Sequence, residues 1–256
     1  MRYKQSPLLL TMILLLILFT FSQGFREASV MGTPKNDGAG FAVIELFTSE
    51  GCSSCPSADE AVAKFLTGNR EQVFVLAFHV DYWDKLGWKD VFSKPAYSVR
   101  QSKYAAVFKL ESAYTPQIVV NGRHEFVGSN AAQLNRVVEK ELANSVTKPI
   151  ALTADGITNN HVLVNYQLNE NMNGKLNIAL VQSHAASDVK RGENVGRHLD
   201  HINVVRDFKT LDLSGVKGKT ELELPAGLTK EDCKVIAYLQ DPASMQISGV
   251  AEIKIR

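Results

Sequence analysis

The chain has few of the features by which common protein classes are recognised. Its 256 residues include only three cysteines, and 28 basic against 27 acidic residues leave a formal net charge of +1. A charge this close to neutral gives no electrostatic case for nucleic acid or an anionic membrane surface as a partner. Its sequence has no glycine-rich phosphate loop, nicotinamide fingerprint or serine–histidine elbow, so we expect no organic cofactor. Internal repeats and low-complexity tracts are also absent.

The chain also lacks a hydrophobic run long enough to cross a membrane. The apolar stretch over residues 8–21 is 14 residues long, whereas a transmembrane helix needs about 20. Basic residues precede this stretch, and Ser22 and Gly24 supply small residues at the spacing that a signal peptidase reads. We therefore expect a secretory signal over residues 1–24, with no stable membrane anchor after its cleavage. A disordered lead-in should follow over residues 25–40.

Two of the three cysteines, Cys52 and Cys55, stand where a predicted strand gives way to a predicted helix. The N-terminus of a helix carries unpaired N–H groups and a partial positive charge, which favour thiolate over thiol. A static disulfide and a metal pair are the alternatives, but so short a bridge restrains the unfolded chain weakly. We favour a redox pair, with Cys52 as the attacking thiolate and Cys55 as the resolving thiol. Cys233 should be a buried small hydrophobic residue.

The hydrophobic periodicity changes character along the chain. Before residue 147 it predicts strands and helices in alternation, with a hairpin at Asn121-Gly122. After residue 147 it predicts short alternating strands, a second hairpin at Asn173-Gly174 and an antiparallel β-sandwich. We therefore predict two domains, at residues 41–146 with an insertion at 81–113, and at residues 147–256. The expected elements of the first domain are strands at 41–47, 73–80, 117–120 and 125–127, and helices at 56–66, 96–110 and 131–143.

Four sequence strings carry a resemblance to a known family: residues 45–56, 79–84, 114–117 and 192–197. Together they strongly resemble secreted bacterial thioredoxin-like proteins catalogued as domain of unknown function 1223. The resemblance covers most of the mature chain and implies an α/β thioredoxin-like domain followed by a smaller antiparallel β-sandwich-like domain. It implies export as well, but no reaction, because the family is functionally uncharacterised.

The resemblance also implies roles for residues beside the cysteines. Pro116 would be a cis-proline facing Cys52 and Cys55, and it would bring Thr115 close to the sulfur atoms. Glu45, on the first strand, would be a buried acid that exchanges protons with Cys55. The alternation of Glu45 with apolar neighbours is equally consistent with a side chain turned towards solvent.

A polar and aromatic segment follows the second predicted strand. In open α/β sheets the carboxyl ends of strands face the ligand crevice, so this segment is a candidate wall for an extended peptide or a small thiol. The alternative is a small separate core beneath a long insertion. The candidate substrate-binding residues are His79, Asp81, Tyr82, Trp83 and Trp88.

A second polar cluster, around residues 192–206, contains His198 and His201, with His184 before it. The histidine spacing is usable for a metal, but solvated or hydrogen-bonded histidines are the plainer interpretation, and we predict no metal site. We favour a loop that packs over the cysteines and restricts what reaches them. Arg197 and Arg206 would then hold a carboxylate of the partner.

These observations favour an exported thiol–disulfide oxidoreductase whose partners are protein or small-molecule thiols and disulfides. Paired thiolates near a histidine also suit Cu(I), although the chain has no methionine-rich segment. A third possibility is a non-catalytic binding module in which the disulfide is structural.

Overall fold

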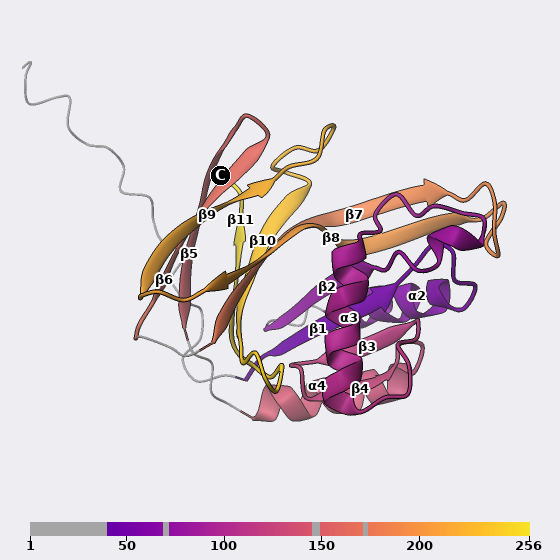
Figure 1. The fold of residues 1–256 in the computed structure, drawn as a ribbon, viewed down its shortest axis with the longest axis horizontal. Coiled ribbons are helices and arrows are strands. Elements are labelled where there is room, and N and C mark those ends of the chain that lie inside the picture. Colours follow the sequence, from indigo (N-terminus) through magenta and orange to yellow (C-terminus); the bar gives the residue numbers. More distant parts are fainter. Residues whose placement is uncertain (1–39, 69–71, 145–148, 171–173) are drawn as a thin grey trace, which may run out of the picture. The chain divides into compact units, whose positions relative to one another are not determined.

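The structure is a computed structural model that describes residues 40–68, 72–144, 149–170 and 174–256 (Figure 1). The predicted signal peptide, the lead-in up to residue 39 and the predicted boundary at residue 147 lie outside these ranges. The described helices are α2 (Cys55–Leu66), the short 3-10 helix η1 (Asp84–Leu86), α3 (Pro95–Phe108) and α4 (Ala131–Ala143). The described strands are β1 (Ala42–Thr48), β2 (Val73–His79), β3 (Gln117–Val120), β4 (His124–Val127), β5 (Ile150–Thr158), β6 (His161–Leu168), β7 (Lys175–Asp188), β8 (His198–Asp212), β9 (Lys217–Glu223), β10 (Cys233–Gln240) and β11 (Ile247–Lys254).

Eight strands form one mixed sheet in the order β11-β10-β7-β8-β2-β1-β3-β4, and β5, β6 and β9 form a separate antiparallel sheet. The predicted α/β thioredoxin-like domain followed by a smaller antiparallel β-sandwich-like domain is therefore wrong. The described chain is mostly β-sheet, and β7, β8, β10 and β11 extend the sheet that contains β1. The extension runs through parallel pairing of β2 with β8 at Ala77 and Val204. It covers an edge of β2 whose backbone groups would otherwise be unpaired.

Hydrophobic periodicity could not predict this extension, because it reports which residues are buried but not which strand edge meets which. The division of the chain into two domains at residue 147 stays a prediction. None of the described helices is long and apolar enough to span a membrane.

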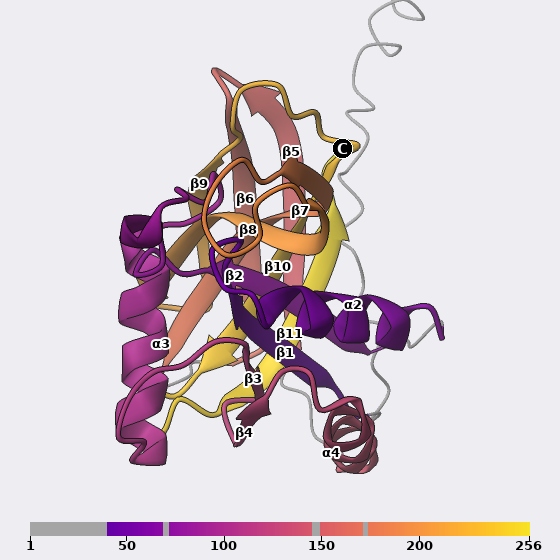
Figure 2. The ribbon, with the colours of Figure 1, turned by 90° about the vertical axis from the view of Figure 1, so that its right-hand side faces the viewer.

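Helices cover both faces of the sheet around β1 (Figure 2). Every residue of β1 is buried, and alternate side chains enter different cores. Ile44 and Leu46 pack with residues of α2 and α4, whereas Val43 and Phe47 pack with residues of α3. A strand buried on both faces explains the continuous apolar run in the sequence.

A further core lies between the three-stranded sheet and the β7–β10 part of the large sheet. The side chains that meet there are fully or almost fully buried and come from both sheets. They include Leu152, Val162, Val164, Ile178, Leu180 and Val235. Cys233 borders the same core as a buried free cysteine, which confirms the prediction made for it. Burial raises the pKa of its thiol to about 11.

The hairpin between β3 and β4 confirms the prediction from its Asn-Gly pair. Asn121 and Gly122 have φ angles of 49° and 64°, as a type I′ turn requires. A Cβ atom on Gly122 would collide with the backbone carbonyl of Met245, so only glycine fits. The Asn121 side chain accepts a hydrogen bond from Val43 N at 2.7 Å and donates one to Phe41 O at 2.9 Å. The turn therefore also holds the start of β1.

Two predictions in the second half of the chain are wrong. The polar region at residues 192–206 is a loop only up to Arg197, after which β8 begins. The inward positions of β8 include His201 and Asn203, and these buried polar side chains obscure the strand pattern. The hairpin predicted at residues 173–174 would pair β6 with β7, but β6 pairs with β5 and β9, and β7 with β8 and β10. Asn173 itself lies outside the described residues.

A buried ion pair connects α3 to two distant strands of the large sheet. Arg100 donates to the two carboxylate oxygens of Glu45 at 2.6 and 3.0 Å, and Tyr238 donates to the same carboxylate at 2.6 Å. Arg100 also donates to Gln240 at 3.0 Å. Four aromatic rings surround the guanidinium carbon at 5.0 to 5.6 Å: those of Phe78, Tyr104, Phe208 and Tyr238.

We predict that Arg100→Met lowers the free energy of unfolding by about 3–5 kcal/mol, because it leaves the Glu45 carboxylate buried without its counter-ion. Urea unfolding followed by circular dichroism measures the loss. The double variant Glu45→Leu/Arg100→Met should recover much of it, since no unpaired charge remains. As a control, Lys64→Met breaks the exposed pair with Glu60 and should cost less than about 1 kcal/mol. Wild-type stability for Arg100→Met would contradict the prediction.

Candidate functional site

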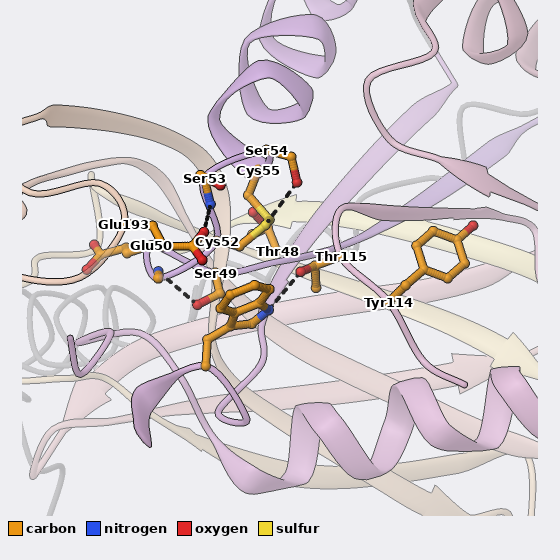
Figure 3. Close-up of a disulfide and its surroundings, with 12 residues drawn as sticks. Thr48, Ser49, Glu50, Cys52, Ser53, Ser54, Cys55, Tyr114, Thr115 and Glu193 are labelled. Carbon is orange, nitrogen blue, oxygen red and sulfur yellow. Dashed lines mark hydrogen bonds between the residues drawn. A yellow bond between two sulfur atoms is a disulfide. The ribbon is translucent and has the colours of Figure 1, made fainter. Parts of the chain in front are cut away.

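Cys52 and Cys55 form a disulfide in the short connection between β1 and α2 (Figure 3). Their Cα atoms are 5.4 Å apart. Consecutive turns build the connection, with Cys52 N donating to Ser49 O and Cys55 N to Cys52 O, both at 3.2 Å. Gly51 is closely packed, because a Cβ on it would lie 3.0 Å from Trp83 Cβ. Although they stand on a connecting segment, Cys52 is only 1% exposed and Cys55 is fully buried.

The N-terminus of α2 lies directly at the disulfide. Ser54 is the N-cap residue, but its side chain makes no capping hydrogen bond, and Pro56 occupies the first turn. The Ser54 hydroxyl instead lies 3.3 Å from Cys52 Sγ. The unpaired N–H groups of the first helical turn favour negative charge at this position. After reduction, the helix and this hydroxyl would both stabilise a thiolate on Cys52.

The segment before β3 approaches the disulfide from another side. The Thr115–Pro116 peptide bond is cis, as expected from the resemblance. Thr115 is among the residues around the disulfide (Figure 3), and its hydroxyl accepts a hydrogen bond from Trp83 Nε1 at 2.8 Å. Pro116 packs near α2, since a Cβ on Gly128 would lie 3.0 Å from Ala58 Cβ and 3.2 Å from Pro116 Cβ.

The aromatic segment after β2 lies against the cysteine connection. Trp88 Nε1 donates to Glu50 Oε2 at 2.6 Å, next to Gly51 and Cys52. Tyr82 is half-buried, and its ring centroid lies 6.4 Å from that of Trp83. The structure thus brings both tryptophans to the site. Their predicted role in binding a substrate stays a prediction.

Two other residues of the predicted wall point elsewhere. Asp81 accepts a hydrogen bond from the hydroxyl of Ser98 in α3 at 2.5 Å. His79 is fully buried, with its Nδ1 2.7 Å from Asp90 Oδ2. Asp90 Oδ2 also accepts from Glu50 N at 2.9 Å. Through Asp90, His79 therefore helps to hold the connection that carries the cysteines.

The loop between β7 and β8 packs against the cysteine segment, as the sequence analysis favoured. Asn194 is buried, and its side-chain amide donates to Glu50 O at 2.8 Å and to Cys52 O at 2.9 Å. The Glu193 carboxylate accepts from Ser53 N at 3.0 Å (Figure 3). Arg197 donates to Asn194 Oδ1 at 3.0 Å, so it supports the loop. Sequence reasoning assigned a role only to Arg197, although Glu193 and Asn194 belong to the same string of residues.

A buried cluster of acids and histidines lies under the disulfide. His201 stands between two carboxylates, with its Nε2 3.5 Å from Glu50 Oε1 and its Nδ1 3.8 Å from Asp59 Oδ2. Its ring centroid is 4.8 Å from that of His79, and the two rings meet edge to face. Burial alone would lower the pKa of His201, but Asp59 and Glu50 outweigh burial and raise it to about 10. His201 is therefore an imidazolium at neutral pH.

Asp90 completes the cluster. Burial would raise the pKa of its carboxyl group, but the imidazole of His79 and the backbone N–H groups of Glu50 and Phe92 have the larger combined effect. The pKa of Asp90 is therefore below its usual value, and the group is ionised. Sequence reasoning missed Glu50, Asp59 and Asp90, whose charged side chains ordinarily lie at the surface.

Two further candidates lie outside this site. Glu45 is on the face of β1 that packs against α3, where its carboxylate is bonded to Arg100 and Tyr238. The structure does not place it with Cys55 on α2, which lies against the opposite face. His198 is exposed and lies 2.8 Å from Asp188, so it does not share a face of β8 with buried His201. Among the described residues, no group of three or more histidine, cysteine or acidic side chains is arranged to hold a metal ion.

Comparisons with known proteins agree with part of the resemblance. A family model described as "Protein of unknown function (DUF1223)" matches residues 43–240, which span the site from β1 to the end of β10. The chain is also similar to the crystal structure of a protein from Agrobacterium tumefaciens. The two share 26% sequence identity with a TM-score of 0.61, over 84% of this chain and 94% of that one. No curated protein matches the chain.

We predict that His201→Gln destabilises the protein by about 3 kcal/mol at pH 6, since it leaves two buried carboxylates unpaired. The pKa of His201 is raised from 6.5 to about 10 on folding. The stabilisation is therefore complete below pH 6.5 and is lost as the pH rises through about 10. Urea unfolding at pH 6, 8 and 10 should show the difference from wild type shrinking with pH. The control, His198→Gln, alters an exposed histidine and should change stability little. A penalty for His201→Gln that does not vary with pH would count against the ion pair.

Proposed function

We propose that this chain, which belongs to the DUF1223 family of proteins of unknown function, is an exported thiol–disulfide oxidoreductase. Its redox pair is Cys52 and Cys55. The observation that carries the proposal is their disulfide at the first turn of α2. So small a loop adds little stability by restraining the unfolded chain. The helix N-terminus, in contrast, gives the bond a chemical use, because it stabilises the thiolate that exchange requires.

The exchange follows thiol–disulfide chemistry. A partner thiolate attacks Cys52 Sγ, the bond between the two sulfurs breaks, and Cys55 leaves as a thiolate that takes up a proton. A second thiolate of the partner then attacks the partner sulfur of the mixed disulfide and releases Cys52. Two electrons pass from the partner, which becomes a disulfide, to the protein, which becomes a dithiol. Oxidation of a partner dithiol runs through the same steps in reverse.

The surrounding residues support these steps. The Ser54 hydroxyl, 3.3 Å from Cys52 Sγ, donates to the sulfur when it becomes negative. Asp59 lies one helical turn beyond Cys55 on the buried face of α2, a separation at which helical side chains are neighbours. It is therefore better placed than Glu45 to exchange a proton with Cys55.

The partners are protein or small-molecule thiols and disulfides, and the chain needs no organic cofactor for this chemistry. Export places the protein in an oxidising compartment, where a disulfide persists. The support for export is the sequence of residues 1–24, which lie outside the described part of the chain.

One observation favours a second candidate, a binding module with a structural disulfide. Both cysteines are almost completely buried, and an inert bond is commonly shielded in this way. The two candidates differ in whether a thiol can exchange with the bond while the protein is folded.

The proposal predicts different behaviour for the two single cysteine variants. Cys55→Ser leaves Cys52 without its resolving partner and should accumulate one glutathione per chain when incubated with oxidised glutathione. Cys52→Ser should form this adduct at least about tenfold more slowly, because the helix N-terminus favours a thiolate at the first cysteine. Intact mass spectrometry of the folded proteins measures both.

The free cysteine provides the matched control. Cys233→Ala, introduced into each variant, should leave the adduct pattern unchanged, since Cys233 is buried and its thiol pKa is raised. Equal, slow labelling of both cysteine variants would favour the structural disulfide. Tight Cu(I) binding by the reduced wild type, with no glutathione exchange, would favour metal handling.

Export has its own test. Expression of the full chain in a bacterium with a periplasm should yield a mature protein that begins at Phe25, because the small residues before it suit a signal peptidase. N-terminal sequencing of the periplasmic fraction identifies the first residue. Replacing Leu14 and Leu15 with arginine interrupts the apolar run and should keep the protein in the cytoplasm. An uncleaved wild-type chain in the cytoplasm would contradict the proposal.

A further inference from the structure

Two side chains of a neighbouring loop hold the buried disulfide segment. The cysteines lie where a strand gives way to a helix, a kind of segment that is usually at the surface. They nevertheless have almost no accessible surface. The loop between β7 and β8, residues 189–197, is bonded to the segment that carries them, with Glu193 accepting from Ser53 N and Asn194 donating to Glu50 O and Cys52 O. We propose that this loop, which we name the latch, must open before the disulfide can exchange, and that these two side chains hold it shut. The inference rests on the proposed function and adds its regulation.

Asn194 makes the closest connection between the latch and the cysteine segment. Its side-chain amide donates one hydrogen to Glu50 O at 2.8 Å and the other to Cys52 O at 2.9 Å. Its own carbonyl accepts from Arg197 at 3.0 Å. All these bonds are side-chain bonds from one buried residue, so substituting that residue frees the latch without altering the cysteine segment itself.

Glu193 adds an electrostatic effect to the closure. Its carboxylate accepts from Ser53 N, between the two cysteines, at 3.0 Å. Hydrogen bonding with Ser53 lowers the pKa of Glu193, so the group is negative at neutral pH. In the closed state the Glu193 carboxylate accepts the hydrogen of an N–H group beside Cys52, so this group cannot bond to a Cys52 thiolate. Its negative charge also opposes the formation of that thiolate. The latch therefore favours the oxidised state as well as covering it.

The latch is built as a unit that can move without unfolding its neighbours. Backbone hydrogen bonds connect its two ends, with Val189 N donating to Arg197 O at 3.0 Å and Gly196 N to Val189 O at 2.8 Å. Gly192 and Gly196 have φ angles of 76° and 79°, a conformation that glycine adopts without strain. The turn can thus keep its shape while the contacts of Glu193 and Asn194 break.

The rate at which tris(2-carboxyethyl)phosphine reduces the disulfide of the folded protein tests the latch. The phosphorus attacks a sulfur, the sulfur–sulfur bond breaks, and water converts the adduct to phosphine oxide and two thiols. Asn194→Ala should react about tenfold faster than wild type, as the loss of two hydrogen bonds would allow. Glu193→Gln should react about threefold faster, since the charged bond to Ser53 becomes neutral.

The control is Val195→Ala, which alters a side chain of the same loop that is 61% exposed and should react at the wild-type rate. Circular dichroism and urea unfolding verify that each variant is folded. If Asn194→Ala does not fold, Glu193→Gln still tests the latch, because the Glu193 side chain is at the surface and its substitution should not prevent folding. Wild-type rates for the folded variants, or equal acceleration by Val195→Ala, would overturn the latch.

The outcome separates the latch from the proposed function. Faster reduction of the variants, in a protein whose disulfide never exchanges with glutathione, would support the latch and contradict the oxidoreductase. Exchange with glutathione at the same rate in wild type and both variants would support the oxidoreductase and contradict the latch.

Discussion

The parallel pairing of β8 with β2 is the contact on which the rest of the site depends. It places the second half of the chain beside the strand that leads into the aromatic segment. His201, on β8, then lies between Glu50 and Asp59, and the loop before β8 reaches over Cys52. Without this pairing, the cysteine segment would lose its contacts with the loop before β8, and Glu50 and Asp59 would lose their counter-ion.

Much of the local structure could be predicted from the sequence. The apolar run of β1, the helical spacing of α2 and the Asn121-Gly122 turn each depend on residues close together in the chain, and the structure agrees with them. The cysteine pair at the start of α2 and the cis bond before Pro116 were also expected. The cysteine pair follows from neighbouring residues, so a local pattern is enough to find it, whereas the cis bond was expected from the family resemblance.

The remaining features depend on contacts between distant residues. The strand β8 was missed because His201 and Asn203 occupy inward positions where an apolar residue would mark the pattern. The fold class was wrong for the same reason, since β8 joins the two halves of the sheet. Glu45 is an acid on a buried strand, and only the positions of Arg100 and Tyr238 reveal why its charge is tolerated. A polar side chain that is satisfied by a distant partner has no local signature.

The central claim is that the Cys52–Cys55 disulfide is an exchangeable redox couple and not an inert bond. The most direct measurement is its redox equilibrium against glutathione in the mature chain, residues 25–256, read by thiol alkylation and mass spectrometry. The account predicts a reversible two-electron transition with a potential between roughly −120 and −270 mV. A disulfide that stays oxidised far below about −300 mV would contradict it and identify the bond as structural.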